Sequence, residues 1–201
     1  MENRIVITGD VIQSRSHGAH EWMPLLEHAI TKYTGTFDIF RGDSFQAEVT
    51  ADQVFESLFY LKSSLRQLEH MDVRIGVGVG NITFRGDDIK KSSGTAFIRS
   101  GEALDMLQKE SLALRSDWSK LDERVNLILT LSTRLTDQWT PNVAQTVQAA
   151  MDHPKASQTQ LSKIIGRTHQ SQVSTELRRG HFSKILEVIN YCTNDLLRYV
   201  K

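Results

Sequence analysis

The sequence predicts an α+β fold in which an antiparallel sheet with helices is followed by an all-α unit. Two observations support this prediction. In the first part of the chain, short apolar runs with a period of two alternate with stripes of helical period. From Thr140 onward every apolar pattern is helical, and Pro and Gly residues divide it into short helices. The order of the elements then specifies the fold further.

The first predicted strand covers residues 4–9 and ends at Asp10. An amphipathic helix follows, because apolar residues recur with helical spacing from Trp22 to Tyr33, and Gly35 is expected to end it. Two strands joined by a tight turn come next. Gly and Asp suit that turn, Arg41-Gly42-Asp43-Ser44. The alternating apolar residues on its two sides are Phe37, Ile39, Phe45, Ala47 and Val49.

A capping box at Thr50–Gln53 is expected to open a second helix with one apolar face. The next strand, Val73–Gly80, alternates apolar residues with glycines, which let another backbone or a ligand come close. Because no helix begins directly after these glycines, a dinucleotide-binding motif is not indicated. The order β-α-β-β-α-β is that of the ferredoxin-like fold. It brings the first strand beside the hairpin, so Asp10 and Asp43 are expected at one edge of the sheet.

The remaining elements divide the chain into three parts. We expect an extra strand at residues 81–84, a polar loop at 85–94, a helix at 95–109 and a last strand at 112–114. A long helix from residue 121 to 139 then links the two halves. The predicted domains are residues 1–118, the linker 119–139 and residues 140–201.

The C-terminal part has the pattern of a helix-turn-helix unit. Thr140-Pro141 is a good helix start, and Ser157–Gln160 is a capping box. A short helix, a turn at Gly166 and a second helix capped by Thr168 follow, as in helix-turn-helix proteins. Double-stranded DNA is therefore the expected partner, although a helical hairpin used only for dimerisation has the same pattern. The residues expected to contact bases or phosphates are Arg167, Thr168, His169, Gln170, Ser171, Gln172, Thr175, Arg178 and Arg179.

Composition and charge agree with a DNA-binding C-terminal part. The net charge is zero overall, but residues 140–201 carry eight Lys and Arg against four Asp and Glu. No apolar run approaches the roughly 18 residues of a membrane span. The single cysteine, Cys192, excludes an internal disulfide, and no signal-peptide core is present, so a cytoplasmic location is expected.

The first half of the chain resembles the SatD family in four motifs. They are Gly9–Ser14, Gly42–Gln46, Arg74–Gly80 and Gly94–Phe97, in this order and at this spacing. Members of that family commonly end in a helix-turn-helix, as this chain is expected to do. We expect a nucleotide or phosphate ligand to contact Gly9, Ser14, Gly42 and Arg74, which lie in these motifs, and Arg99, which follows the last of them.

The same residues are more distantly similar to the catalytic domain of class III nucleotide cyclases. In those proteins an acid after the first strand and an acid at the hairpin tip bind two metal ions, and Asp10 and Asp43 match these positions. The resemblance thus implies Mg²⁺ or Mn²⁺ with a nucleotide. The sequence departs from the cyclase pattern at Ile98 and Glu102, where cyclases have an Asn and an Arg that stabilises transition-state charge. Arg99 stands beside them and is the possible substitute.

Three functions are consistent with these features. The first is a DNA-binding regulator, expected to be a homodimer, whose cyclase-like domain senses a nucleotide or phosphate ligand. The second is a nucleotide cyclase or nucleotidyltransferase with an accessory DNA-binding module. The third is a scaffold in which Asp10 and Asp43 are turn residues without a role.

Overall fold

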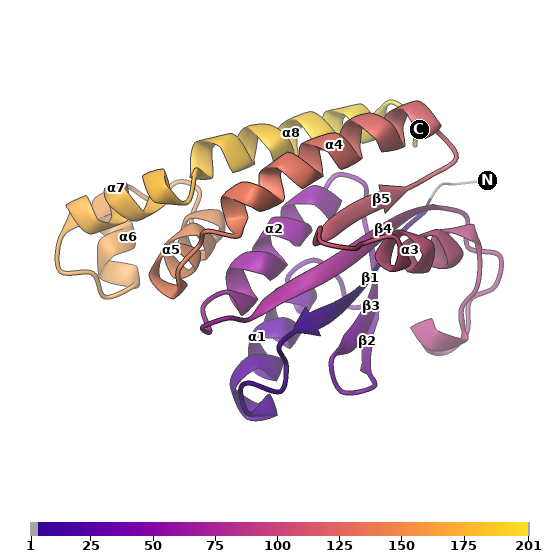
Figure 1. The fold of residues 1–201 in the computed structure, drawn as a ribbon, viewed down its shortest axis with the longest axis horizontal. Coiled ribbons are helices and arrows are strands. Elements are labelled where there is room, and N and C mark those ends of the chain that lie inside the picture. Colours follow the sequence, from indigo (N-terminus) through magenta and orange to yellow (C-terminus); the bar gives the residue numbers. More distant parts are fainter. Residues whose placement is uncertain (1–3, 201) are drawn as a thin grey trace.

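The computed structural model describes residues 4–200, and these form one five-stranded sheet with eight α-helices (Figure 1). Apart from the strand predicted at residues 81–84, the elements occur in the predicted order. The strands are β1 Arg4–Ile12, β2 Phe37–Phe40, β3 Ser44–Val49, β4 Asp72–Gly80 and β5 Leu112–Arg115. The helices are α1 Ala19–Thr31, α2 Val54–Leu65, α3 Thr95–Asp105, α4 Ser119–Thr136, α5 Pro141–Asp152, α6 Gln158–Ile164, α7 Gln170–Arg179 and α8 Phe182–Leu197.

Strand β1 lies inside the sheet, whose order is β2-β3-β1-β4-β5. It pairs antiparallel with β3 and with β4, whereas β5 joins β4 in parallel. The register sets Asp10 opposite Ser44 on one side and Arg74 on the other. The hairpin and β4 therefore flank the end of β1 on its two sides. This is the edge where the sequence predicts Asp10 and Asp43.

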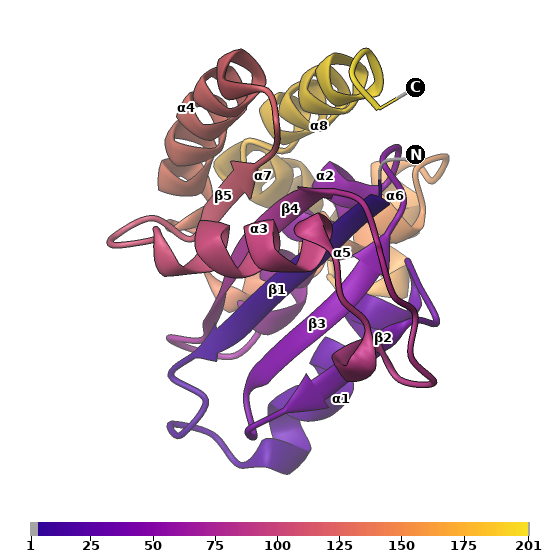
Figure 2. The same cartoon turned by 90° about the vertical axis from the view of Figure 1, so that its right-hand side faces the viewer.

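Helix α3 lies on one face of the sheet, and α1 and α2 lie on the other (Figure 2). The glycines of β4 allow α3 to come very close. A Cβ atom at Gly78 would lie 2.1 Å from the carbonyl oxygen of Ala96, and one at Gly76 would lie 2.3 Å from that of Ser100. The predicted close approach of another backbone is thus made by a helix of the same chain.

Helix α2 forms the centre of the molecule. Eleven of its twelve residues are buried, since α1, α5, α8 and β4 all pack against it. Its Lys62 is completely buried, and its Nζ donates to both carboxylate oxygens of Asp72 at 2.8 and 3.0 Å and to Ser111 Oγ at 2.9 Å. Arg66 also donates to Asp72, at 2.7 Å, and to the backbone oxygen of Trp139, at 3.3 Å.

Helix α4, predicted as a linker, packs along the outer edge of the sheet. Its Asn126 side chain accepts from the N–H of Leu114 at 2.7 Å and donates to the Leu114 carbonyl at 2.9 Å. This pair of bonds occupies backbone groups of β5 that would otherwise form an open edge. The main hydrophobic core runs from the sheet through Trp139 and Val143 to Ile185, and so crosses the predicted domain boundary.

Helices α5, α6 and α7 pack together around a small separate core. It consists of Ala149, Ala150, Leu161 and Val173. The predicted helix starts at Thr140 and Ser157 are confirmed, because each hydroxyl accepts a hydrogen bond from the first helical turn. Trp139 Nε1 donates to the Gly180 carbonyl at 3.0 Å and ties this unit to the end of α4.

Several local predictions are corrected. Residues 81–84 form no strand but one isolated bridge between Phe84 and Ser93, because the chain there turns back on its own loop. Helix α3 ends at Asp105, before Lys109. Helix α7 begins after His169 and not after Thr168, since the Gln172 side chain accepts from the His169 N–H. No side-chain cap opens α2; Thr50 Oγ1 bonds the Gln53 side chain instead.

Among residues 4–200, no helix is both long and apolar enough to cross a membrane.

The buried Lys62–Asp72 pair yields a stability prediction. Replacing Asp72 with Ala leaves the Lys62 ammonium buried without its carboxylate, so the free energy of unfolding should fall by about 3–5 kcal/mol. Urea denaturation measures this change. The control is Glu187→Ala, which breaks the exposed Lys184–Glu187 pair and should cost less than about 1 kcal/mol. Equal effects of the two substitutions would contradict the central role of the buried pair.

Candidate functional site

The predicted site lies where β1 ends beside the hairpin and β4. Asp10 on β1 and Arg74 on β4 form a two-bond ion pair. Arg74 Nε donates to one carboxylate oxygen at 2.9 Å, and Nη2 donates to the other at 2.5 Å. Both side chains are partly exposed in a shallow hollow of about 390 Å³, which Asp43 and Ser44 also line. The bond to Asp10 raises the pKa of the Arg74 guanidinium, which stays charged.

Asp43 reaches the same hollow from the hairpin tip. Its Oδ2 accepts a hydrogen bond from Ser14 Oγ at 2.7 Å, and its backbone carbonyl accepts from the Val11 N–H at 3.0 Å. The segment after β1 and the hairpin tip are therefore fixed to each other. The structure thus brings together Asp10, Ser14, Asp43 and Arg74, four of the residues predicted from the sequence. The predicted Gly9 is buried beside them, with Phe45 and the Arg74 carbonyl against its Cα.

Two strained backbone positions flank this hollow. Gln13, just after β1, has φ of 59°, and Arg41, just before Gly42 in the hairpin loop, has φ of 54°. Gly42 itself has φ of 91°, which a glycine adopts without steric cost. Both residues lie in turns, as do the other two non-glycine residues with positive φ in the described chain, His70 and His181, so these values reflect sharp turns on both sides of the hollow.

The donor set does not fit the two-metal site that the cyclase resemblance implies. Both carboxylate oxygens of Asp10 are bonded to Arg74, and Asp43 Oδ2 is bonded to Ser14. Within residues 4–200, no group of three or more His, Cys, Asp or Glu side chains is arranged to hold a metal ion. A divalent cation normally needs several free oxygen ligands. A metal ion would first have to displace Arg74 from Asp10.

Arg99 is not part of the Asp10 site. On α3, its Nη1 donates to the Val79 carbonyl at 2.6 Å, and its Nη2 forms an ion pair with Asp117. Val79 is opposite Ile5, whereas Arg74 is opposite Asp10, so the two places are five residues apart along β1. At about 3.4 Å per residue the separation is roughly 17 Å. Arg99 therefore holds α3 and the loop after β5 in place.

Two basic residues at this edge were missed by the sequence reasoning. Arg15 follows Ser14, and Arg41 precedes Gly42; both are exposed, and neither has an ion pair among the residues that the structure describes. They add positive charge beside Asp10 and Asp43. Arg15 directly follows the motif Gly9–Ser14, and Arg41 directly precedes the motif Gly42–Gln46, so their positions in the sequence could have identified them.

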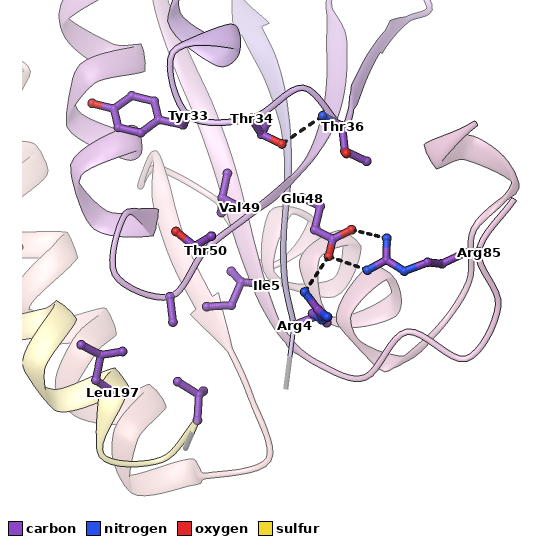
Figure 3. Close-up of a pocket in the computed structure, with 12 residues that line it drawn as sticks. Arg4, Ile5, Tyr33, Thr34, Thr36, Glu48, Val49, Thr50, Arg85 and Leu197 are labelled. Atoms are coloured by element: carbon purple, nitrogen blue, oxygen red, sulfur yellow. Dashed lines mark hydrogen bonds and ion pairs between the residues drawn. The ribbon is translucent and has the colours of Figure 1, made fainter. Parts of the chain in front are cut away.

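A larger hollow, of about 460 Å³, lies at the other end of β1 (Figure 3). Arg85 forms two hydrogen bonds with Glu48, at 2.9 and 2.8 Å, and Arg4 approaches the same carboxylate at 3.8 Å. The two arginines in this hollow thus interact with its carboxylate, Glu48. It contains none of the predicted site residues, and we assign the candidate site to the Asp10 edge despite its smaller hollow.

The residues predicted to contact DNA gather around the start of α7. Thr168, His169, Gln170, Ser171 and Gln172 are exposed, and Thr175 is half-buried one turn further on. Val173 is fully buried on the opposite face of α7 and packs into the small core with Leu161 of α6. The polar face of α7 therefore points to solvent because its apolar face is held by α6. Arg178 and Arg179 at the end of α7 are exposed as well.

Arg167 has a different environment from the other predicted DNA contacts. Its Nε donates to both carboxylate oxygens of Glu176, at 3.1 and 3.0 Å, and its Nη2 donates to the Asn142 carbonyl at 3.1 Å. Glu176 also accepts from Thr146 Oγ1 at 2.5 Å. This network links the turn before α7 to α5, so the guanidinium of Arg167 stabilises the unit.

Cys192 is fully buried on α8, in the main core. Burial raises the pKa of its thiol to about 12, with a smaller contribution from the Asp195 carboxylate. A thiol in that environment stays protonated and cannot act as a nucleophile near neutral pH.

The raised pKa of Cys192 gives a pH prediction. An ordinary thiol titrates near 8.5. Above that pH the unfolded chain loses its thiol proton while the folded chain keeps it until about 12, so this group's contribution to stability is complete below about pH 8.5 and falls as pH rises. At pH 8 the native thiol should resist iodoacetamide and react after unfolding in urea, which mass spectrometry can follow. Rapid alkylation of the native protein would contradict the burial.

Comparison with known proteins shows a distant structural similarity. The chain matches no protein-family model and no curated protein. Its fold matches solved chains that include a bacterial light-regulated adenylyl cyclase, with a TM-score of 0.39 and 16% sequence identity. That match covers 56% of this chain and 43% of the cyclase, so the chain spans less than half of that protein. The resemblance to the SatD family stays a prediction, and no activity follows from so distant a likeness.

Proposed function

We propose that this chain is a DNA-binding transcriptional regulator whose ferredoxin-like, cyclase-like sheet domain senses a nucleotide or phosphate ligand. The observation that carries the proposal is the face of α7. It presents amide and hydroxyl side chains to solvent at its start and, at its end, two exposed arginines that have no ion pair with any residue from 4 to 200. Gln and Ser side chains read base edges, and arginines contact phosphates.

The arrangement of α6 and α7 supports this proposal. Leu161 and Val173 bury the contact between the two helices, and the network around Arg167 fixes the turn between them. Such a pair forms a helix-turn-helix, in which the second helix enters the major groove with its N-terminal residues against the bases. In α7 those residues are Gln170, Ser171 and Gln172. The two-fold symmetry of most DNA sites would make the working form a homodimer.

The charges support a phosphate contact at the end of α7. Arg178, Arg179 and Lys163 are exposed and have no ion pair within the described residues. The exposed Lys184 on α8, in contrast, is bonded to Glu187. Unpaired arginines beside a polar helix face are available to neutralise phosphates, the interaction that dominates DNA affinity.

The Asp10 edge supports the sensing part of the proposal. Arg74 is charged and partly exposed, and Arg15 and Arg41 lie next to the motifs that form the hollow. A phosphate group would compete with Asp10 for the Arg74 guanidinium, which binds phosphates and carboxylates in the same two-bond geometry. A Mg²⁺ or Mn²⁺ ion would accompany the ligand only if Arg74 releases Asp10.

The alternative function is a nucleotide cyclase or nucleotidyltransferase with an accessory DNA-binding module. The convergence of Asp10 and Asp43 at one sheet edge favours it. The engagement of Arg74 with Asp10 and the distance of Arg99 from that edge favour sensing over turnover, because charge stabilisation in the transition state is missing. Pyrophosphate release from NTPs with Mg²⁺ or Mn²⁺ that disappears in Asp10→Ala and Asp43→Ala would support the enzyme.

The DNA-binding proposal is tested by a salt titration. The protein should bind random duplex DNA at low salt, and Arg178→Ala and Arg179→Ala should each weaken that binding and reduce the salt slope by about 1. Arg134→Ala is the matched control, because Arg134 is an exposed arginine on α4 that pairs with Glu110. Fluorescence anisotropy gives the affinities. Absence of binding at low salt would sink the proposal.

The sensing proposal is tested by ligand-induced stabilisation. A ligand present at about a hundred times its Kd adds about 2.7 kcal/mol, which corresponds to several degrees in Tm for a chain of this size. ATP, GTP and pyrophosphate, each with and without Mg²⁺, are the probes. Stabilisation should be lost in Arg74→Ala and kept in Arg85→Ala, whose arginine lies in the other hollow. A Tm that no probe shifts would contradict the sensing proposal and is the result that the scaffold interpretation predicts.

A further inference from the structure

A third hollow, of about 400 Å³, lies where α5, α6 and α7 meet α2 and α8. The apolar residues that line it include Leu161 of α6, Leu177 of α7, Met151 of α5 and Ile189 of α8. Its size is at the lower end of the range of about 300–1,000 Å³ that is typical of small-molecule pockets. Its walls are mostly apolar with a few polar groups, as such pockets usually are.

This hollow is the seam between the two hydrophobic cores of the molecule. Met151 and Ile189 belong to the main core, whereas Leu161 belongs to the small core of α5, α6 and α7. Phe182 is half-buried and packs against both. An apolar molecule in the seam would contact both cores and lose its own apolar surface from water, which is favourable in proportion to the area buried.

The carboxylate of Glu56 stands in the wall of this seam. Glu56 is the one residue of α2 that is not buried, and it lines the hollow. It accepts a hydrogen bond from Tyr33 Oη at 3.0 Å and has no ion pair within residues 4–200. The nearby cation, Lys32, is bonded to Asp152 at 2.6 Å. Tyr33 itself is partly buried, and burial raises the pKa of its hydroxyl, with Glu56 contributing.

We propose that this seam is a binding site for a small amphipathic cation, with its ammonium or guanidinium head on Glu56 and its apolar body between the two cores. Negative charge in a mostly apolar pocket selects such a ligand over a neutral or anionic one of the same shape, because a charge-assisted hydrogen bond is the strongest polar contact available there.

Occupancy of this seam also affects the helices that carry the proposed DNA contacts. Gln158 of α6 lines the hollow, and its side chain is hydrogen-bonded to Gln170 at the start of α7. Leu161 and Leu177 lie in the wall itself. A ligand that joins the two cores thus stabilises α6 and α7 in one orientation against α2 and α8. Binding of the cation does not depend on the DNA-binding proposal and is measured without DNA.

Isothermal titration calorimetry with three probes of one shape tests the site. The probes are 2-phenylethylamine, 2-phenylethanol and phenylacetate. The amine should bind in a saturable manner about tenfold tighter than the alcohol, and the carboxylate should bind weakest. Hydrogen exchange with the saturating amine should slow several-fold for the amides of α6 and α7.

Three variants assign the binding to Glu56 and to this seam. Glu56→Gln keeps an acceptor for Tyr33 and should reduce the affinity for the amine to that for the alcohol. Ala156→Trp, in the wall of the hollow, should abolish binding of all three probes. Glu102→Gln, an exposed acid on α3, is the control and should change nothing.

Equal affinities for the three probes, or an unchanged amine affinity in Glu56→Gln, would overturn the charge selection. Absence of saturable binding by any probe would overturn the site itself. Binding without slower exchange in α6 and α7 would overturn the link to those helices.

Discussion

The buried Lys62–Asp72 ion pair joins the central helix α2 to strand β4. A charged group without solvent must be paired, because an isolated ammonium in the core costs several kcal/mol. The pairing fixes α2 against the start of β4, Ser111 adds the loop before β5, and Arg66 extends the network to the end of α4. Helix α2 is therefore held by the sheet, by α4 and by the C-terminal unit. These contacts account for its burial.

The two candidate functional regions depend on this centre in different ways. The Asp10 edge is held by the sheet register and by the hydrogen bond from Ser14 to Asp43, so its shape is fixed by backbone pairing. The face of α7 is held by the small core and by the Arg167 network, and α7 packs on α5 and α8 beside an unfilled seam. Segments held by few buried contacts are the ones that move most easily. A change in that seam is therefore the simplest way to reorient α7.

Much of the fold could be predicted because local patterns agreed with the final packing. The order of the strands put Asp10 and Asp43 at one edge, and the glycines of β4 indicated a close backbone neighbour. Arg74 was expected to contact a ligand, but its pairing with Asp10 required the register between β1 and β4, which the sequence does not encode locally. Arg99 and Arg167 were predicted as ligand and phosphate contacts from their neighbours in sequence. Each is instead bonded within the fold, to Val79 and to Glu176, because a partner distant in sequence lies within reach.

Most secondary elements, their order and the polar face of α7 can be recognised from local patterns, because apolar periodicity, capping residues and turn residues act over a few neighbours. The pairing of charges among residues 4–200, in contrast, became visible only in the folded chain. Asp10 is paired with Arg74, whereas Glu56 has no cationic partner in the described chain. Arg178 and Arg179 are exposed. The physical reason is that an ion pair depends on the distance between two side chains, and that distance is set by packing between elements far apart in the sequence.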